Sequence, residues 1–309
     1  MAAPQLTARH FHPRTWPTWL GVALIKLVSH LPIGLLLACG SALGAFAGLV
    51  LRGRRRVVRV NLELCFPELD ARERERRVDR HFRDLGTGIF EAALAWFASD
   101  ARLRARGEVV GLEHLRAAQA DGSGVLLLTG HFTTLELGAR YLSLAGTPFH
   151  AMYRPYANPV LDYFMHRWRE QRSGRPALPR DDLRALVRAL RQGHAIWYAP
   201  DQTLDRRISV FAPFFGVPVG TITATARLAE MGRAKVVPFF PQRVDGRYRI
   251  VILPALDAFP SGDELTDATR VNRVLEEGIR LAPTQYFWIH RRFKRVPPGT
   301  PKPYTKRRR

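Results

Sequence analysis

The feature that most constrains this chain is an uncharged run of 21 residues, Leu31 to Leu51, which the sequence "RGRRR" follows at once. A helix of that length measures about 31 Å, enough to cross the hydrocarbon core of a bilayer. A secretory signal peptide would begin sooner and end at a small-residue cleavage site, not at an arginine cluster. The run therefore predicts a retained membrane anchor, and the sequence leaves open whether the anchor spans the bilayer or is monotopic.

The residues around this run indicate how the anchor meets the membrane. Upstream, Trp16 and Trp19 suit a membrane interface, whereas Lys26 would be costly in mid-bilayer. The arginines after Leu51 place that flank on the cytoplasmic side by the positive-inside rule, so we expect the rest of the chain there too. A repeated small-residue face, formed by Gly40, Gly44 and Gly48, is suited to packing against another helix.

The charge of the chain points to an anionic partner. Its 48 Lys and Arg residues outnumber 27 Asp and Glu residues, for a formal net charge of +21. Nucleic acid, an anionic membrane face, and an acidic carrier or phosphorylated substrate all fit that excess, and no nucleic-acid-binding motif is visible. Two cysteines, Cys39 and Cys65, do not indicate a disulfide framework, and no Cys/His spacing resembles a zinc site, so no metal is expected.

The middle of the chain alternates short β-rich runs with helical ones. The expected strands are Val125–Leu128, Phe149–Tyr153, Ala195–Ala199, Lys235–Phe240 and Tyr248–Leu253, and the expected helices include Pro67–Phe97, Asp181–Gln192, Thr221–Met231 and Ala268–Leu281. This alternation predicts an α/β fold with a mixed, largely parallel sheet flanked by helices. We expect an anchor at 1–57, a helical segment at 58–110, an α/β domain at 111–297 and a basic tail at 298–309. The tail is typical of a disordered segment or of a basic strip against lipid.

One expected strand end carries a histidine and a glutamate, in "VLLLTGHFTTLELGARYL". Functional residues of open α/β sheets gather at such strand ends. A carboxylate from Glu136 on one imidazole nitrogen of His131 would make the other nitrogen a general base for a hydroxyl. The alternative is a capping box, in which the Glu136 side chain accepts a hydrogen bond from the backbone N–H of Thr133 at the start of the helix. On this alternative His131 is an ordinary hydrogen-bonded residue of the turn.

Several longer strings carry a resemblance to a known family. They are "GHFTTLELGAR", "NLELCFPEL" from Asn61, "YRP" from Tyr153, "WYAPD" from Trp197 and "WIHRRF" from Trp288. Together they resemble the late acyltransferases of lipid A biosynthesis, from about Phe11 to Pro297. More narrowly, they resemble the lauroyl transferase type that acts on Kdo-modified lipid IVA.

The resemblance implies an inner-membrane enzyme with a glycerolipid-acyltransferase-like α/β domain and its catalytic side in the cytoplasm. Such an enzyme moves an acyl chain from acyl carrier protein to a hydroxyl on a hydroxyacyl chain of the lipid A precursor, without a further cofactor or nucleic acid. The family's His-x4-Asp/Glu motif falls on His131 and Glu136. Arg154, which follows an expected strand, matches the arginine of a second motif and is the candidate for stabilising the oxyanion.

Further residues are candidates for contacts with substrate. Asp201, at another strand end, would bind or orient substrate or else cap its loop. Arg291 and Arg292 suit phosphate or Kdo carboxylates, or a solvated basic face. The aromatic, proline-broken segment "SVFAPFFGVPVG" from Ser209 is expected to be a loop, lining an acyl-chain channel or closing the core.

Two other functions remain as alternatives at this stage. A glycerolipid acyltransferase acting on a lysophosphatidate would use the same His-acid chemistry. A non-catalytic basic membrane protein would use only the charge of its surface. The long strings quoted above argue against the first alternative, and the lack of a visible nucleic-acid-binding motif argues against the second.

Overall fold

The structure is a computed structural model that describes residues 5–202 and 209–305. Its α-helices are α1 (Trp16–Val28), α2 (Ile33–Val50), α3 (Arg52–Cys65), α4 (Ala71–Phe97), α5 (Asp100–Arg104), α6 (Leu112–Gln119), α7 (Leu135–Leu144), α8 (Pro159–Ser173), α9 (Leu183–Arg191), α10 (Ala224–Gly232) and α11 (Glu264–Leu281). Its strands are β1 (Gly107–Val110), β2 (Gly124–Leu128), β3 (Phe149–Tyr153), β4 (Leu178–Pro179), β5 (Ala195–Tyr198), β6 (Ser209–Phe214), β7 (Val217–Ile222), β8 (Ala234–Val244) and β9 (Arg247–Ile252). Two short 3₁₀ turns, Ala8–Phe11 and Pro13–Thr15, precede α1.

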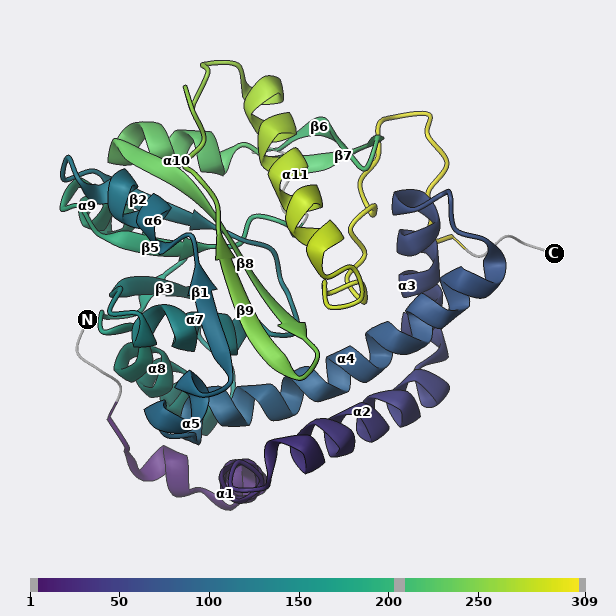
Figure 1. The fold of residues 1–309 in the computed structure, drawn as a ribbon, viewed down its shortest axis with the longest axis vertical. Helices are drawn as coiled ribbons and strands as arrows, with labels where there is room; N and C mark the ends of the chain where they lie inside the picture. The colour runs from purple at the N-terminus through teal and green to yellow at the C-terminus, as the bar shows by residue number, and fades with distance from the viewer. Residues whose placement is uncertain (1–4, 203–208, 306–309) are drawn as a thin grey trace.

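The strands form a seven-stranded sheet in the order β1-β9-β8-β2-β5-β3-β4 and a separate two-stranded β6-β7 hairpin. In the larger sheet β8 and β9 are antiparallel, and the other neighbouring pairs are parallel (Figure 1). Helices cover both faces of this sheet, as its buried central strands require. The predicted α/β class with a mixed, largely parallel sheet is therefore confirmed.

Alternate residues of the central strands face two separate cores, one on each side of the sheet. Leu126, Leu128, Ile196, Tyr198 and Val236 pack on one side, together with residues of α9, α10 and α11. Val125, Leu127, Ala195, Trp197 and Val237 pack on the other, with residues of α6, α7 and α4. Because side chains of a strand alternate between its faces, a fully apolar strand can serve both cores, which explains why "GVLLL" is buried throughout.

The apolar run at the N-terminal side becomes α2, which by length and composition could cross a membrane. Its glycine face packs against α4 of the same chain: a Cβ atom placed on Gly44 would lie 2.0 Å from the carbonyl oxygen of Phe82. The small-residue face therefore does pack against another helix, and that helix is intramolecular. The boundary expected after residue 57 falls inside α3, and the segment expected to be helical to residue 110 ends in strand β1.

Most of the expected elements are present within a few residues of their predicted ends, including α4, with Asp70 as its N-cap. The expected loop from Ser209 is wrong: residues 209–214 and 217–222 pair as the β6–β7 hairpin and pack against α11. The sequence pattern also missed α8. The basic tail is docked as far as Tyr304, whose hydroxyl donates to Asn61 Oδ1 at 2.5 Å, and residues 306–309 lie outside the described residues.

Candidate active site

Two loops bring a histidine and an aspartate together at one edge of the sheet. The neighbouring parallel strands β2 and β5 end level with each other, since Leu128 pairs with Tyr198. His131 lies three residues beyond Leu128, and Asp201 lies three residues beyond Tyr198. Because both residues follow their paired strand ends by the same number of residues, their side chains lie side by side. They lie at the carboxyl edge of the sheet, where open α/β sheets hold their functional sites.

Asp201 binds His131 through both of its carboxylate oxygens. Oδ1 lies 2.5 Å from the ring nitrogen Nδ1, and Oδ2 accepts the backbone N–H of His131 at 2.8 Å. An ionised carboxylate can only accept hydrogen bonds, so Nδ1 carries the proton in a neutral ring and Nε2 has the free lone pair. Asp201 is buried, whereas about a third of the His131 side chain is exposed and lines a pocket.

The electrostatics of this pair favour a charged imidazolium. Burial lowers the pKa of His131, but the charge and hydrogen bond of Asp201 outweigh it and raise that pKa above 6.5. Burial in turn raises the pKa of Asp201, yet the charge and hydrogen bonds of His131, with a hydrogen bond from Tyr286, lower it to about 2. Asp201 therefore remains ionised beside His131 throughout the neutral pH range.

Glu136 does not contact His131, contrary to the predicted pairing. Its oxygens accept from Arg169 of α8 at 2.9 Å and from the indole of Trp96 at 3.3 Å. The capping-box alternative is wrong as well, since α7 begins at Leu135 with Thr134 as its N-cap and without a side-chain cap bond. The carboxylate that binds His131 is Asp201, and Glu136 belongs to a different ion pair in the same pocket.

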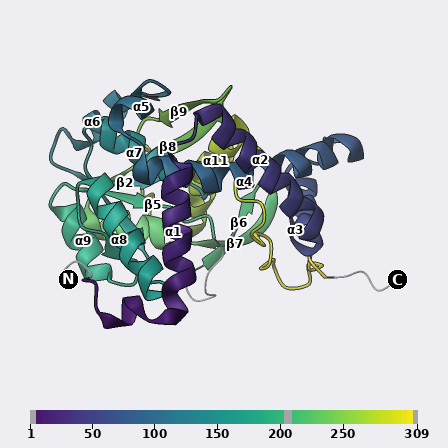
Figure 2. The same cartoon turned by 90° about the horizontal axis from the view of Figure 1, so that it is seen from below.

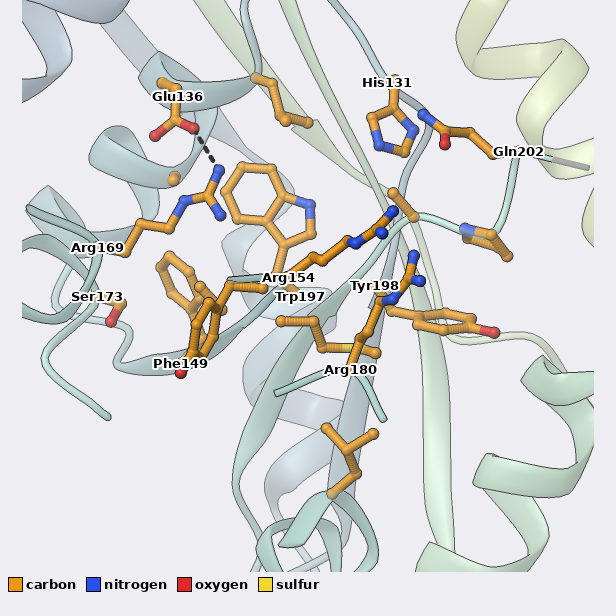
Figure 3. Close-up of a pocket in the computed structure, with 18 of the residues that line it drawn as sticks. His131, Glu136, Phe149, Arg154, Arg169, Ser173, Arg180, Trp197, Tyr198 and Gln202 are labelled. Carbon is orange, nitrogen blue, oxygen red and sulfur yellow. Dashed lines mark hydrogen bonds and ion pairs between the residues drawn. The ribbon is translucent and has the colours of Figure 1, made fainter. Parts of the chain in front are cut away.

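The pocket itself measures about 590 Å³ and extends over the carboxyl edge of the sheet. His131, Glu136 and Arg169 line it, together with Arg154 after β3 and Arg180 after β4. Figure 3 shows the side chains of Arg154 and Arg180 extending toward His131, while Arg169 is paired with Glu136. Much of the remaining wall is apolar and includes Trp96, Phe149, Trp168, Trp197, Ile222 and Leu228. An apolar cavity with a few convergent charged groups suits a ligand that has a hydrocarbon chain and a polar reacting end.

The chain resembles known proteins along almost its whole length. A family model for bacterial lipid A biosynthesis acyltransferases matches residues 4–295. The chain is 42% identical to the lipid A biosynthesis lauroyltransferase of Escherichia coli (strain K12), over 97% of this chain and 99% of the relative. It is 40% identical to the palmitoleoyltransferase of the same organism over 93% and 94%, and 31% identical to its myristoyltransferase over 98% and 95%.

The chain belongs to the bacterial lipid A biosynthesis acyltransferases. It is thus a membrane-associated enzyme that acylates a lipid A precursor, and the interpretation as a non-catalytic basic membrane protein is wrong. The family does not by itself fix the acyl chain, because relatives of nearly equal identity are named for lauroyl and palmitoleoyl transfer.

Two of the arginines predicted to bind substrate lie outside the pocket of this acyltransferase. Arg292 is 2% exposed and donates to the carbonyl oxygen of Gly220 and the hydroxyl of Thr221, so it is a structural residue between the hairpin and the C-terminal segment. Arg291 lies on the surface with its guanidinium 5.9 Å from the ring centre of Tyr304. The segment from Ser209 to Gly220 is also absent from the pocket wall.

The acyltransferase has further site residues that the sequence pattern missed. Arg169 comes from α8, a helix that was not predicted, and Arg180 follows the two-residue strand β4. Tyr286 makes a hydrogen bond to Asp201 that helps to lower the pKa of the Asp201 carboxyl. A sequence signal was available for one of them, because Tyr286 lies two residues before "WIHRRF", a string that carries the family resemblance. Among residues 5–202 and 209–305, no group of three or more His, Cys, Asp or Glu side chains is arranged to hold a metal ion.

Proposed function

We propose that this acyltransferase moves a lauroyl chain from acyl carrier protein to the hydroxyl of a hydroxyacyl chain on Kdo-modified lipid IVA. The observation that supports it is the His131–Asp201 pair on the wall of a largely apolar pocket. The lauroyl assignment comes from the 42% identical relative named for that transfer. Acyl carrier protein is the donor that the sequence resemblance implies, and the positive charge of the chain suits an acidic carrier.

The chemistry proposed for the pair is general-base attack. Nε2 of His131 takes the proton of the acceptor hydroxyl as the hydroxyl oxygen attacks the thioester carbonyl carbon. The resulting imidazolium is stabilised by the ionised Asp201 at 2.5 Å. When the tetrahedral intermediate collapses, the carbon–sulfur bond breaks, the electron pair leaves with the sulfur, and the thiolate receives the proton from His131. No covalent acyl-enzyme is needed.

The oxyanion of this intermediate needs positive donors already in place. Arg154 is the candidate, because it lies in the pocket on the loop after β3 and extends toward His131 (Figure 3). Arg180 extends to the same region from the loop after β4 and is a second donor for the thioester oxygen or for an acceptor phosphate. Arg169 is already paired with Glu136, so that pair orders the pocket wall next to the reacting groups.

The proposed setting is the cytoplasmic side of the bacterial inner membrane, where a soluble acyl carrier and a membrane-embedded lipid precursor would meet.

An acyl-transfer assay tests the proposed function. The purified enzyme in phospholipid vesicles is supplied with carrier-bound acyl chains of different lengths and with Kdo-modified tetra-acylated acceptor, and the masses of the products are determined by mass spectrometry. We expect addition of a single 12-carbon chain, abolished in His131→Ala and unaffected in His114→Ala, because His114 lies on α6, which does not line the pocket. Preferred transfer of a 14- or 16-carbon chain would overturn the lauroyl assignment, and preferred acylation of lysophosphatidate would favour the glycerolipid alternative.

A further inference from the structure

The apolar helix α2 lies along α4 instead of standing away from the protein. A Cβ on Gly40 would lie 2.7 Å from the Cα of Thr87, and one on Gly86 would lie 2.3 Å from the carbonyl oxygen of Gly40. The start of α2 is in contact too, since Ile33 and Leu36 share a buried cluster with Leu94 of α4. The two helices therefore touch backbone to backbone along most of α2, as Figure 1 also shows.

The segments before and after α2 both bind the same α/β domain. Before it, Thr18 of α1 accepts a hydrogen bond from Asn158 at 2.8 Å, and the Trp19 and Phe164 rings lie 5.2 Å apart. After it, buried Asn61 of α3 donates to the carbonyl oxygens of Trp288 and His290 at 2.7 and 2.8 Å. A helix that spans a bilayer has its two ends on opposite sides of about 30 Å of hydrocarbon. The observed contacts hold both ends of α2 on one side.

Helices α1 and α2 lie on the same side of the molecule (Figure 2), and both carry exposed apolar side chains. These side chains are between 45 and 72% exposed: Trp16, Leu20, Leu24, Leu27, Leu35, Leu43, Phe46, Leu49 and Val50. The same stretch of chain carries the exposed basic residues Arg14, Lys26, Arg52 and Arg54, and the sequence contains no acidic residue before Glu63. Exposed apolar side chains on a segment whose charged residues are all basic are complementary to the surface of an anionic bilayer.

We propose that α1 and α2 lie in the plane of the membrane surface, with their apolar faces in the outer part of the lipid and both ends of α2 on the side of the catalytic domain. The acyltransferase is then monotopic, and this holds whichever acyl chain it transfers. The arrangement also places the pocket close to lipid. Trp96 of α4 and Trp168 of α8 line the pocket, and these are the helices on which α2 and α1 rest.

The first test compares the two sides of α2 directly. In a Cys39→Ser, Cys65→Ala background, single cysteines are introduced at the exposed positions Ala8, before α2, and Ala117, on α6 in the catalytic domain. Spheroplasts are treated with a membrane-impermeant maleimide before and after permeabilisation. We expect the two cysteines to be labelled under the same conditions. Labelling of residue 8 in intact spheroplasts with residue 117 protected, or the reverse, would overturn the proposal.

The second test distinguishes an in-plane helix from a hairpin that dips into the bilayer. Spin labels at Leu35, Leu43 and Val50 are measured for depth in vesicles of phosphatidylethanolamine and phosphatidylglycerol. An in-plane helix gives equal depths, in the outer part of the lipid. A helix along the bilayer normal would place position 43 about 10 Å deeper than position 50 at about 1.5 Å of rise per residue, and that result would refute the in-plane placement.

A binding assay checks that the exposed apolar side chains of α2, and not apolar exposure in general, hold the enzyme to lipid. Phe46→Asp with Leu49→Asp is expected to weaken partition into the same vesicles about 100-fold, from the lost burial of two large apolar side chains. The matched control, Leu265→Asp with Leu281→Asp, changes two similarly exposed leucines of α11. Equal weakening by both pairs, or by neither, would contradict the proposal.

Discussion

Replacing Asp201 with asparagine removes the charge beside His131 and nearly preserves the shape of the side chain. The pKa of the Asp201 carboxyl is about 2 instead of 3.8 although burial opposes this, so the difference comes mainly from His131. It corresponds to a net stabilisation of the carboxylate by about 2 kcal/mol, after the cost of burial. Because the imidazolium forms in the transition state, loss of the carboxylate charge predicts a fall in kcat of about 10- to 100-fold.

The pH profile of the same variant gives a second, independent readout. His131 must be neutral to accept a proton, so the rate falls as the pH drops below its pKa. Asp201 holds that pKa above 6.5, and Asp201→Asn therefore moves the acid limb of kcat/KM to lower pH while the rate at the plateau is reduced. The assay is acyl transfer in vesicles between pH 5 and 9, with the fold checked by circular dichroism.

Glu136→Gln is the matched control, because Glu136 binds Arg169 and Trp96 and not His131. We expect its acid limb to stay in place, with its effect confined to binding and to the order of the pocket wall. The reasoning is refuted if Glu136→Gln moves the acid limb and Asp201→Asn does not. That result would mean that the carboxylate of Glu136, five residues along the chain, reaches His131 in the working enzyme.

Three further changes test other contacts. Gly44→Ala should lower the free energy of unfolding by about 2 kcal/mol, since the new Cβ meets the backbone of α4. Gly34 has open space around it, so Gly34→Ala should be neutral or slightly stabilising. Thermal unfolding of both variants checks this difference. Arg292→Met should destabilise the fold by about 3 kcal/mol, and Arg291→Met hardly at all, which urea unfolding would show. Arg154→Met should reduce kcat about 100-fold without loss of stability, and an unchanged kcat would remove it from the mechanism.

Much of the fold could be predicted because its signals are local. The strands β2, β3 and β5 are short, largely apolar runs, and α4 begins after an aspartate that caps it. The pattern of apolar residues and the helix cap were therefore sufficient to predict these elements. The β6–β7 hairpin was missed for a local reason as well. Pro213 and Pro218 are opposite each other in the hairpin, and proline normally argues against a strand.

The site was harder to predict because its partners come from separate parts of the chain. His131 was identified from its position after a strand, but its carboxylate was sought nearby, at Glu136. Asp201 lies 70 residues away and becomes a neighbour only through the pairing of β2 with β5. Arg292 shows a second limit of the sequence: a basic residue in a family string suggests substrate binding, and only the structure shows that its side chain is buried and donates to the carbonyl oxygen of Gly220 and the hydroxyl of Thr221.

The contacts on both sides of α2 have a consequence for biosynthesis. If α1 and α3 dock on one domain, no described segment of the chain has to be translocated across the bilayer. The apolar surface of α2 is shielded on its glycine face only after α4 has been made, because α4 follows α2 in the chain and supplies Phe82 and Gly86. Until then the nascent helix presents both faces, and that interval is when a chaperone or the membrane itself would have to cover it.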